Sequence, residues 1–116
     1  MNSNRITEDY VSFETAKLLK EKGFNYQGFD YIDFEGEVIR QDRPTLQMAT
    51  KWLRKEHNIL LFPLPAQENG KLVHLVEVWT WNEEEGIYES TYAPMPRKEP
   101  EQAVEAALKY CLENLI

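Results

Sequence analysis

The alternation of apolar and polar positions is clearest in residues 72–81, LVHLVEVWTW. The β-branched and aromatic residues of this segment predict a strand, and side chains alternate between the two faces of a strand. One face would carry Val73, Leu75, Glu77, Trp79 and Trp81, and the other Leu72, His74, Val76, Val78 and Thr80. Neither face is polar. We therefore expect both faces to need cover, from the chain's own helices or from a second molecule.

Three other segments have apolar residues at helical spacing. Residues 13–22 lie between Ser12, a favourable N-cap, and Gly23, a residue that often follows a helix end. Residues 45–57 form a second predicted helix, which begins at Thr45. The last helix follows Pro100, and its apolar positions repeat at i, i+3, i+4 and i+7. Those positions are Val104, Ala107, Leu108, Cys111, Leu112 and Leu115.

Short apolar runs beside turn residues predict the other strands. Residues 31–34 and 37–40 flank Glu35-Gly36 and predict a hairpin, placed at a sheet edge or as a flap. Residues 59–62 predict a strand that either is short or keeps Pro63 and Pro65 facing outward, because proline cannot donate to a ladder.

Two turns surround the strand at residues 72–81. Asn69-Gly70 is a strong hairpin signal before it, and residues 83–86 turn the chain into a last strand at 87–92. The order α-β-β-α-β-β-β-α predicts an α+β fold, with an antiparallel sheet of about four to five strands. We expect three helices packed mostly on one sheet face, Trp52 and the last helix filling much of the core, and a single domain over residues 1–116.

Composition narrows the classes of partner and location. The chain has 13 Lys and Arg against 20 Asp and Glu, a net charge of −7, which disfavours nonspecific binding to nucleic acid or to an anionic membrane. Its single cysteine excludes an internal disulfide and fits a reducing cytosol. The first residues lack the apolar region of a signal peptide, and no run has the length of a membrane span. We expect a cytoplasmic protein without a membrane partner.

Candidate catalytic residues are few. His57 and His74 are the only histidines, and no serine, cysteine or carboxylate stands at a spacing that completes a triad with them. Cys111 lies on the apolar stripe of the last helix, where a thiol behaves as a small hydrophobe. Glu83, Glu84 and Glu85 predict a solvated hairpin tip and not a calcium loop. We expect no enzymatic activity, catalytic residue, metal or cofactor, although a triad assembled in space stays open.

Candidate interaction residues gather around the strand at residues 72–81. Trp79 and Trp81, with Tyr88 and Tyr92, could form an aromatic platform beside Glu77. A shift of one residue in the turn would move both tyrosines to the opposite face. Core packing, self-association, partner binding and a small-molecule site around Glu77, His74 and the tryptophans all remain open.

A basic cluster marks the second predicted helix. Arg43, Lys51, Arg54 and Lys55, with Arg40 nearby, are candidate contacts for phosphates or for an acidic partner, or form a solvated surface.

Three segments resemble a known family. Residues 6–24 (ITEDYVSFETAKLLKEKGF), 44–58 (PTLQMATKWLRKEHN) and 105–116 (EAALKYCLENLI) are similar to a family of small uncharacterised proteins of gut bacteria and their phages. The resemblance implies a small intracellular protein that is often associated with mobile elements, and brings no activity or site residue. We expect a non-enzymatic interaction or accessory domain that binds a protein or self-associates through its sheet. The alternative is a nucleic-acid-associated regulator of the phage or mobile-element type, acting through residues 45–57.

Overall fold

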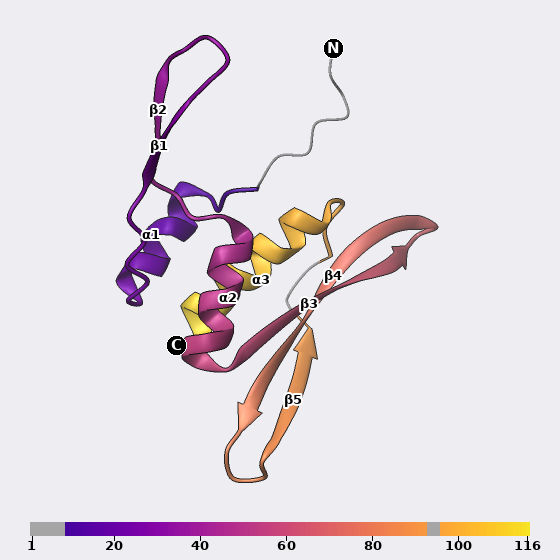
Figure 1. Cartoon of the computed structure of the whole chain (residues 1–116). Coiled ribbons are helices and arrows are strands. Elements are labelled where there is room, and N and C mark those ends of the chain that lie inside the picture. Colours follow the sequence, from indigo (N-terminus) through magenta and orange to yellow (C-terminus); the bar gives the residue numbers. More distant parts are fainter. Residues whose placement is uncertain (1–8, 93–95) are drawn as a thin grey trace.

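The computed structural model describes residues 9–92 and 96–116, and its elements follow the predicted order (Figure 1). The elements are α1 (Phe13–Glu21), β1 (Phe29–Ile32), β2 (Val38–Gln41), α2 (Leu46–His57), β3 (Ile59–Glu68), β4 (Lys71–Asn82), β5 (Ile87–Tyr92) and α3 (Pro100–Asn114). The predicted α+β class is confirmed. None of the helices in the described ranges combines the length and apolarity needed to cross a membrane.

The helix ends lie where their capping residues predict. The Ser12 hydroxyl accepts a hydrogen bond from the Thr15 backbone N–H at 3.1 Å, and the Thr45 hydroxyl accepts one from Met48 at 3.0 Å. Each bond satisfies a donor that the first turn of a helix leaves free. Asn58 ends α2 in the left-handed conformation, with φ 54°. Local sequence therefore fixes these boundaries.

The five strands divide between two antiparallel sheets. β3, β4 and β5 form one sheet with β4 in its centre, and β1 and β2 form a separate hairpin. Figure 1 shows this hairpin projecting away from the helices. Of the two placements open to it, the flap is the one observed, because within residues 9–92 and 96–116 no third strand lies beside its two strands of four residues.

β3 runs through both prolines to Glu68 and is longer than residues 59–62. Pro63 pairs with Val76 and Pro65 with His74, and β3 is an edge strand. The two prolines are two residues apart, so their nitrogens face the same side of the strand. Because that side is the free edge, no ladder hydrogen bond is lost.

The core lies between the helices and one face of the larger sheet. Val76 and Val78 of β4 are buried there, below the inward side of α3. Its helical members include Leu19 of α1, Leu53 of α2, and Ala103, Ala107, Leu108, Cys111 and Leu112 of α3. The expectation for Trp52 needs a correction, because it packs at the margin of the core. Its ring stacks on Phe24 with centroids 5.3 Å apart.

Candidate interaction site

Strand register decides which residues share the face opposite the helices. Trp81 pairs with Tyr88, Trp79 with Ser90 and Glu77 with Tyr92. Paired residues point to the same side of a sheet, so both tyrosines lie on the tryptophan face. We call this surface the open face. It consists of Leu60, Phe62, Leu64, Val73, Leu75, Glu77, Trp79, Trp81, Tyr88 and Tyr92.

The open face is apolar and only partly covered. None of its residues belongs to the buried core, and its large exposed side chains keep between 37% (Tyr88) and 61% (Tyr92) of their surface accessible. The helices pack on Val76, Val78 and Ile59, whose side chains point the other way. One face of β4 is therefore covered by the chain's own helices, and the other face is left partly exposed.

Aromatic contacts order the open face. The rings of Trp81 and Tyr88 meet edge to face, with centroids 5.0 Å apart and an interplanar angle of 67°. Phe62 and Trp79 make a second T-shaped pair at 6.3 Å and 86°. Such pairs favour defined ring orientations. The rings of the open face are therefore held in defined orientations within a single copy of the chain, as an aromatic platform.

Glu77 lies within this platform. The indole N–H of Trp79 donates a hydrogen bond to Glu77 Oε1 at 3.3 Å, and Phe62 and Tyr92 are its cross-strand neighbours. Its side chain is partly buried. A carboxylate in these surroundings loses hydration when the face is covered, so Glu77 limits how tightly an apolar partner can bind.

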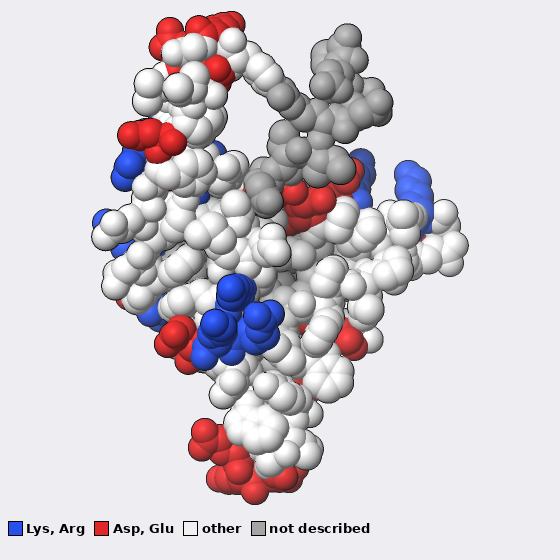
Figure 2. All heavy atoms as spheres, in the orientation of Figure 1, with Lys and Arg blue, Asp and Glu red and all other residues white. Residues whose placement is uncertain are grey.

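Charge differs between the two ends of the sheet. Glu83, Glu84 and Glu85 are exposed at the β4–β5 turn, which Asn82 braces by accepting the Glu85 backbone N–H at 3.1 Å. Lys71 stands at the opposite end of β4, directly across from Glu68 of β3, and Arg97 pairs with the His74 backbone towards that end. Figure 2 shows acidic side chains at the β4–β5 tip and basic ones near the β3–β4 turn.

Two of the five basic residues are engaged within the chain. Arg40 Nε donates to Asp42 Oδ1 at 2.9 Å, and Arg40 Nη1 lies 3.6 Å from Asp30 Oδ1. Arg43 donates to the Val11 carbonyl at 3.2 Å and lies over the ring of Phe13 at 4.4 Å. Arg43 is therefore held by structural contacts, and the exposed side chains of the cluster on α2 are Lys51, Arg54 and Lys55 (Figure 2).

The remaining candidates for chemistry have structural roles. Cys111 is fully buried, and burial raises the pKa of its thiol to about 12, so the reactive thiolate is suppressed. His57 packs its ring edge-on against Trp52 at 4.9 Å. The backbone of His74 pairs with Arg97 and extends the sheet. Within residues 9–92 and 96–116, no three His, Cys, Asp or Glu side chains gather as a metal site would require.

Sequence reasoning missed two contributors to the exposed apolar surface. Phe62 belongs to the open face only through its pairing with Glu77, which requires the register of β3 on β4. Ile32, Phe34 and Val38 lie on the separate hairpin and are largely exposed. In the sequence, the signal for Phe62 was a large apolar side chain beside Pro63, and the signal for the hairpin was a large apolar side chain beside an acidic turn.

Comparison with known proteins adds no information about the site. No protein-family model, curated protein or solved structure matches the chain. The fold and the site define an α+β domain whose antiparallel sheet has helices on one face and an aromatic platform on the other.

Proposed function

We propose that this chain is a non-enzymatic interaction domain that self-associates through its open face. The observation that carries the proposal is the unequal cover of β4, with Val76 and Val78 fully enclosed and Trp81 and Tyr92 exposed on the opposite side. Exposed aromatic patches of this kind are typical of protein contact sites. A cytoplasmic location is part of the proposal, supported by the single buried free thiol.

The charges at the sheet ends favour a second copy as the occupant. A two-fold axis that lies between the two sheets and runs perpendicular to β4 would stack the two open faces and set the two β4 strands antiparallel. The Glu83–Glu85 tip of one copy would then lie beside Lys71 of the other, twice over. Attraction between the three carboxylates of the tip and Lys71 favours this orientation over the parallel one, and Glu68 beside Lys71 reduces the preference.

The size of the open face sets the expected strength. Its strands contain 10, 12 and 6 residues, which at about 3.4 Å per residue and 4.8 Å between strands gives a footprint of about 450 Å². Standard interfaces bury about 800 Å² of accessible surface per partner. The accessible surface of the open face is larger than its flat footprint, because the aromatic side chains project from the sheet. We expect reversible association, with a Kd on the order of micromolar.

Tryptophan emission tests the surface directly. Trp52 lies on α2, so Trp52→Phe leaves Trp79 and Trp81 of the open face as the only indole fluorophores. Dilution of this variant from high to low concentration should shift its emission to longer wavelength, because the two indoles regain water contact as copies separate. Sedimentation velocity over the same concentrations should show the mass falling in parallel.

The control removes aromatic surface from the open face. In Trp52→Phe combined with Tyr92→Ser, the concentration dependence of the emission should move to much higher protein concentration. A chain that stays monomeric at all concentrations, with emission independent of dilution, would refute self-association. A falling mass without any change in emission would place the contact elsewhere on the molecule.

A further inference from the structure

The β1–β2 hairpin exposes apolar side chains that the core does not use. Ile32, Phe34 and Val38 are 71%, 81% and 67% exposed. They sit at the outer end of the hairpin, which projects from the body of the protein (Figure 1). An isolated two-stranded hairpin is marginally stable in water, so its shape must be held by contacts at its base and tip.

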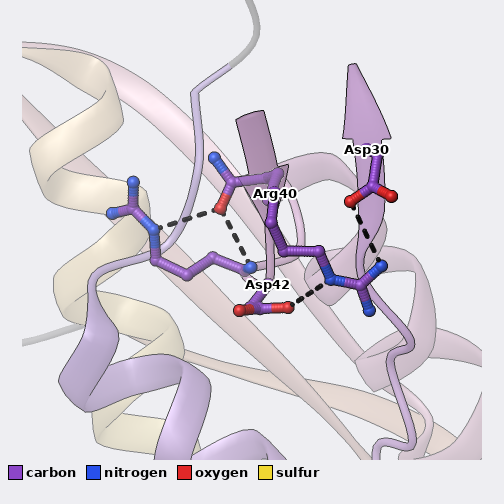
Figure 3. Close-up of polar contacts among 5 residues, drawn as sticks. Asp30, Arg40 and Asp42 are labelled. Carbon is purple, nitrogen blue, oxygen red and sulfur yellow. Dashed lines mark hydrogen bonds and ion pairs between the residues drawn. The ribbon is translucent and has the colours of Figure 1, made fainter. Parts of the chain in front are cut away.

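The base of the hairpin is braced by polar contacts (Figure 3). Arg40 of β2 bridges Asp30 of β1 and Asp42 beyond the hairpin, at 3.6 and 2.9 Å. Gln41 Oε1 accepts hydrogen bonds from the backbone N–H of Arg43 at 3.0 Å and from its guanidinium at 3.3 Å. These bonds tie the end of β2 to the segment that enters α2.

The tip is also ordered. Asp33 Oδ1 accepts the backbone N–H groups of Glu35 at 2.9 Å and Glu37 at 2.8 Å, which closes the turn. Gly36 supplies the positive φ of 82° that the turn needs. The hairpin is therefore a pre-organised arm, and ordering it costs little when it meets a partner.

The chemistry of the tip indicates what it can meet. Phe34 is 81% exposed and stands between Asp33 and Glu35 in the sequence of the tip, with Glu37 beyond the turn. Acidic side chains gather at this end of the molecule (Figure 2). Carboxylates repel nucleic acid and anionic membranes. The complementary surface is an apolar hollow bordered by Lys or Arg.

The chain itself carries such a surface. Lys51, Arg54 and Lys55 lie at i, i+3 and i+4 on one exposed side of α2. Beside them is a hollow of about 170 Å³, lined by Thr50, Arg54 and residues 59–62 of β3. Within one molecule the hairpin makes no extensive contact with α2, and Figure 1 shows the tip of the hairpin far from this end of α2.

We propose that the hairpin tip of one copy docks in the α2–β3 hollow of a second copy, with Phe34 in the hollow and Glu35 and Glu37 facing Lys51, Arg54 and Lys55. Each copy offers one tip and one hollow, so a two-fold arrangement forms the contact twice. The hairpin lies outside the open face, whereas the hollow adjoins that face through Leu60 and Phe62, so the contact is a second interface beside the first.

Charge reversal with complementation tests this contact. The tip-reversed variant is Glu35→Lys with Glu37→Lys, and the helix-reversed variant is Lys51→Glu with Lys55→Glu. Each alone sets like charges against each other and should associate roughly tenfold more weakly than the wild type at low ionic strength. An equimolar mixture should recover association, because each tip then meets a hollow of opposite charge.

Three controls separate this contact from others. Glu21→Lys with Glu113→Lys makes the charge change of the tip-reversed variant at exposed helix ends and should leave association unchanged. Phe34→Ser should weaken association without altering charge. Both charge-reversed variants, in the Trp52→Phe background, should keep the emission shift that reports the open face, so failure of one interface is distinguishable from failure of the other.

The mixture decides the outcome. Association of the mixture that is no stronger than that of either variant alone overturns the proposal, as does a Phe34→Ser variant that associates like the wild type. Retention of the wild type on DNA or RNA that is lost in the helix-reversed variant, without any change in self-association, also overturns it and assigns α2 to nucleic acid.

Discussion

Tyr92→Ser removes the most exposed aromatic side chain of the open face. Tyr92 lies at the end of β5, opposite Glu77, and is 61% exposed. Its side chain contributes little to the core, so the variant should fold. It removes surface that only a second copy would bury, and therefore separates the contribution of this residue to association from its contribution to folding.

The expected magnitude follows from the exposed area. A tyrosine side chain buries about 150–200 Å² when fully covered, so the exposed part is about 100 Å². At about 25 cal/mol per Å², complete burial would contribute about 2.5 kcal/mol for each copy, and about twice that for a symmetric pair. Because interfaces recover only part of the free energy expected from the buried area, we expect a loss of about 2–3 kcal/mol in the free energy of association, or roughly 30- to 150-fold in Kd.

Sedimentation velocity across a concentration series measures the Kd, and urea unfolding at low concentration checks monomer stability. Leu72→Ser is the matched control, because Leu72 is 66% exposed but points to the other face of β4. We expect Leu72→Ser to associate like the wild type. An equal loss of association in both variants, or none in Tyr92→Ser, would refute the assignment of the open face as the interface.

Three further predictions probe the platform and the core. Glu77→Gln should strengthen self-association about tenfold in the same sedimentation assay, because no carboxylate then loses its hydration on burial; weaker association would mean that Glu77 binds a cation across the interface. Leu108→Ala should lower the free energy of unfolding by about 2–5 kcal/mol in urea titration, since Leu108 is fully buried, and a loss below about 1 kcal/mol would contradict the packing of α3. Cys111, with its pKa raised to about 12 by burial, should resist iodoacetamide at pH 8 in the folded protein and react once urea unfolds it; rapid alkylation of the native chain would show that α3 opens.

Local signals were sufficient for most elements. Ser12, Thr45 and Asn58 set helix ends by hydrogen bonds or backbone conformations that involve only nearby residues. Asn69 and Gly70 both adopt positive φ at the β3–β4 turn, as the sequence of that turn predicts. The length of β3 was harder to predict, because Pro63 and Pro65 are tolerated only on an edge strand, and strand order is a property of the whole sheet.

The candidate site divides in the same way. Alternation alone placed Glu77, Trp79 and Trp81 on one face of a strand. It could not decide whether Tyr88 and Tyr92 joined them, because a shift of one residue in the turn at 83–86 would have reversed both. Nor could it show that Arg43 is occupied by Val11 and Phe13, since those residues are 30 or more positions away in the chain.

The sequence by itself determined the α+β class, the order of the elements and the two apolar faces of the strand at residues 72–81, because these follow from periodicity and from capping over a few residues. Only the tertiary structure decided which of those faces the helices cover, and that the first hairpin stands alone as an arm. Both depend on contacts between segments distant in the chain, where the side chains of α3 fill the space over Val76 and Val78 and leave Trp81 and Tyr92 exposed.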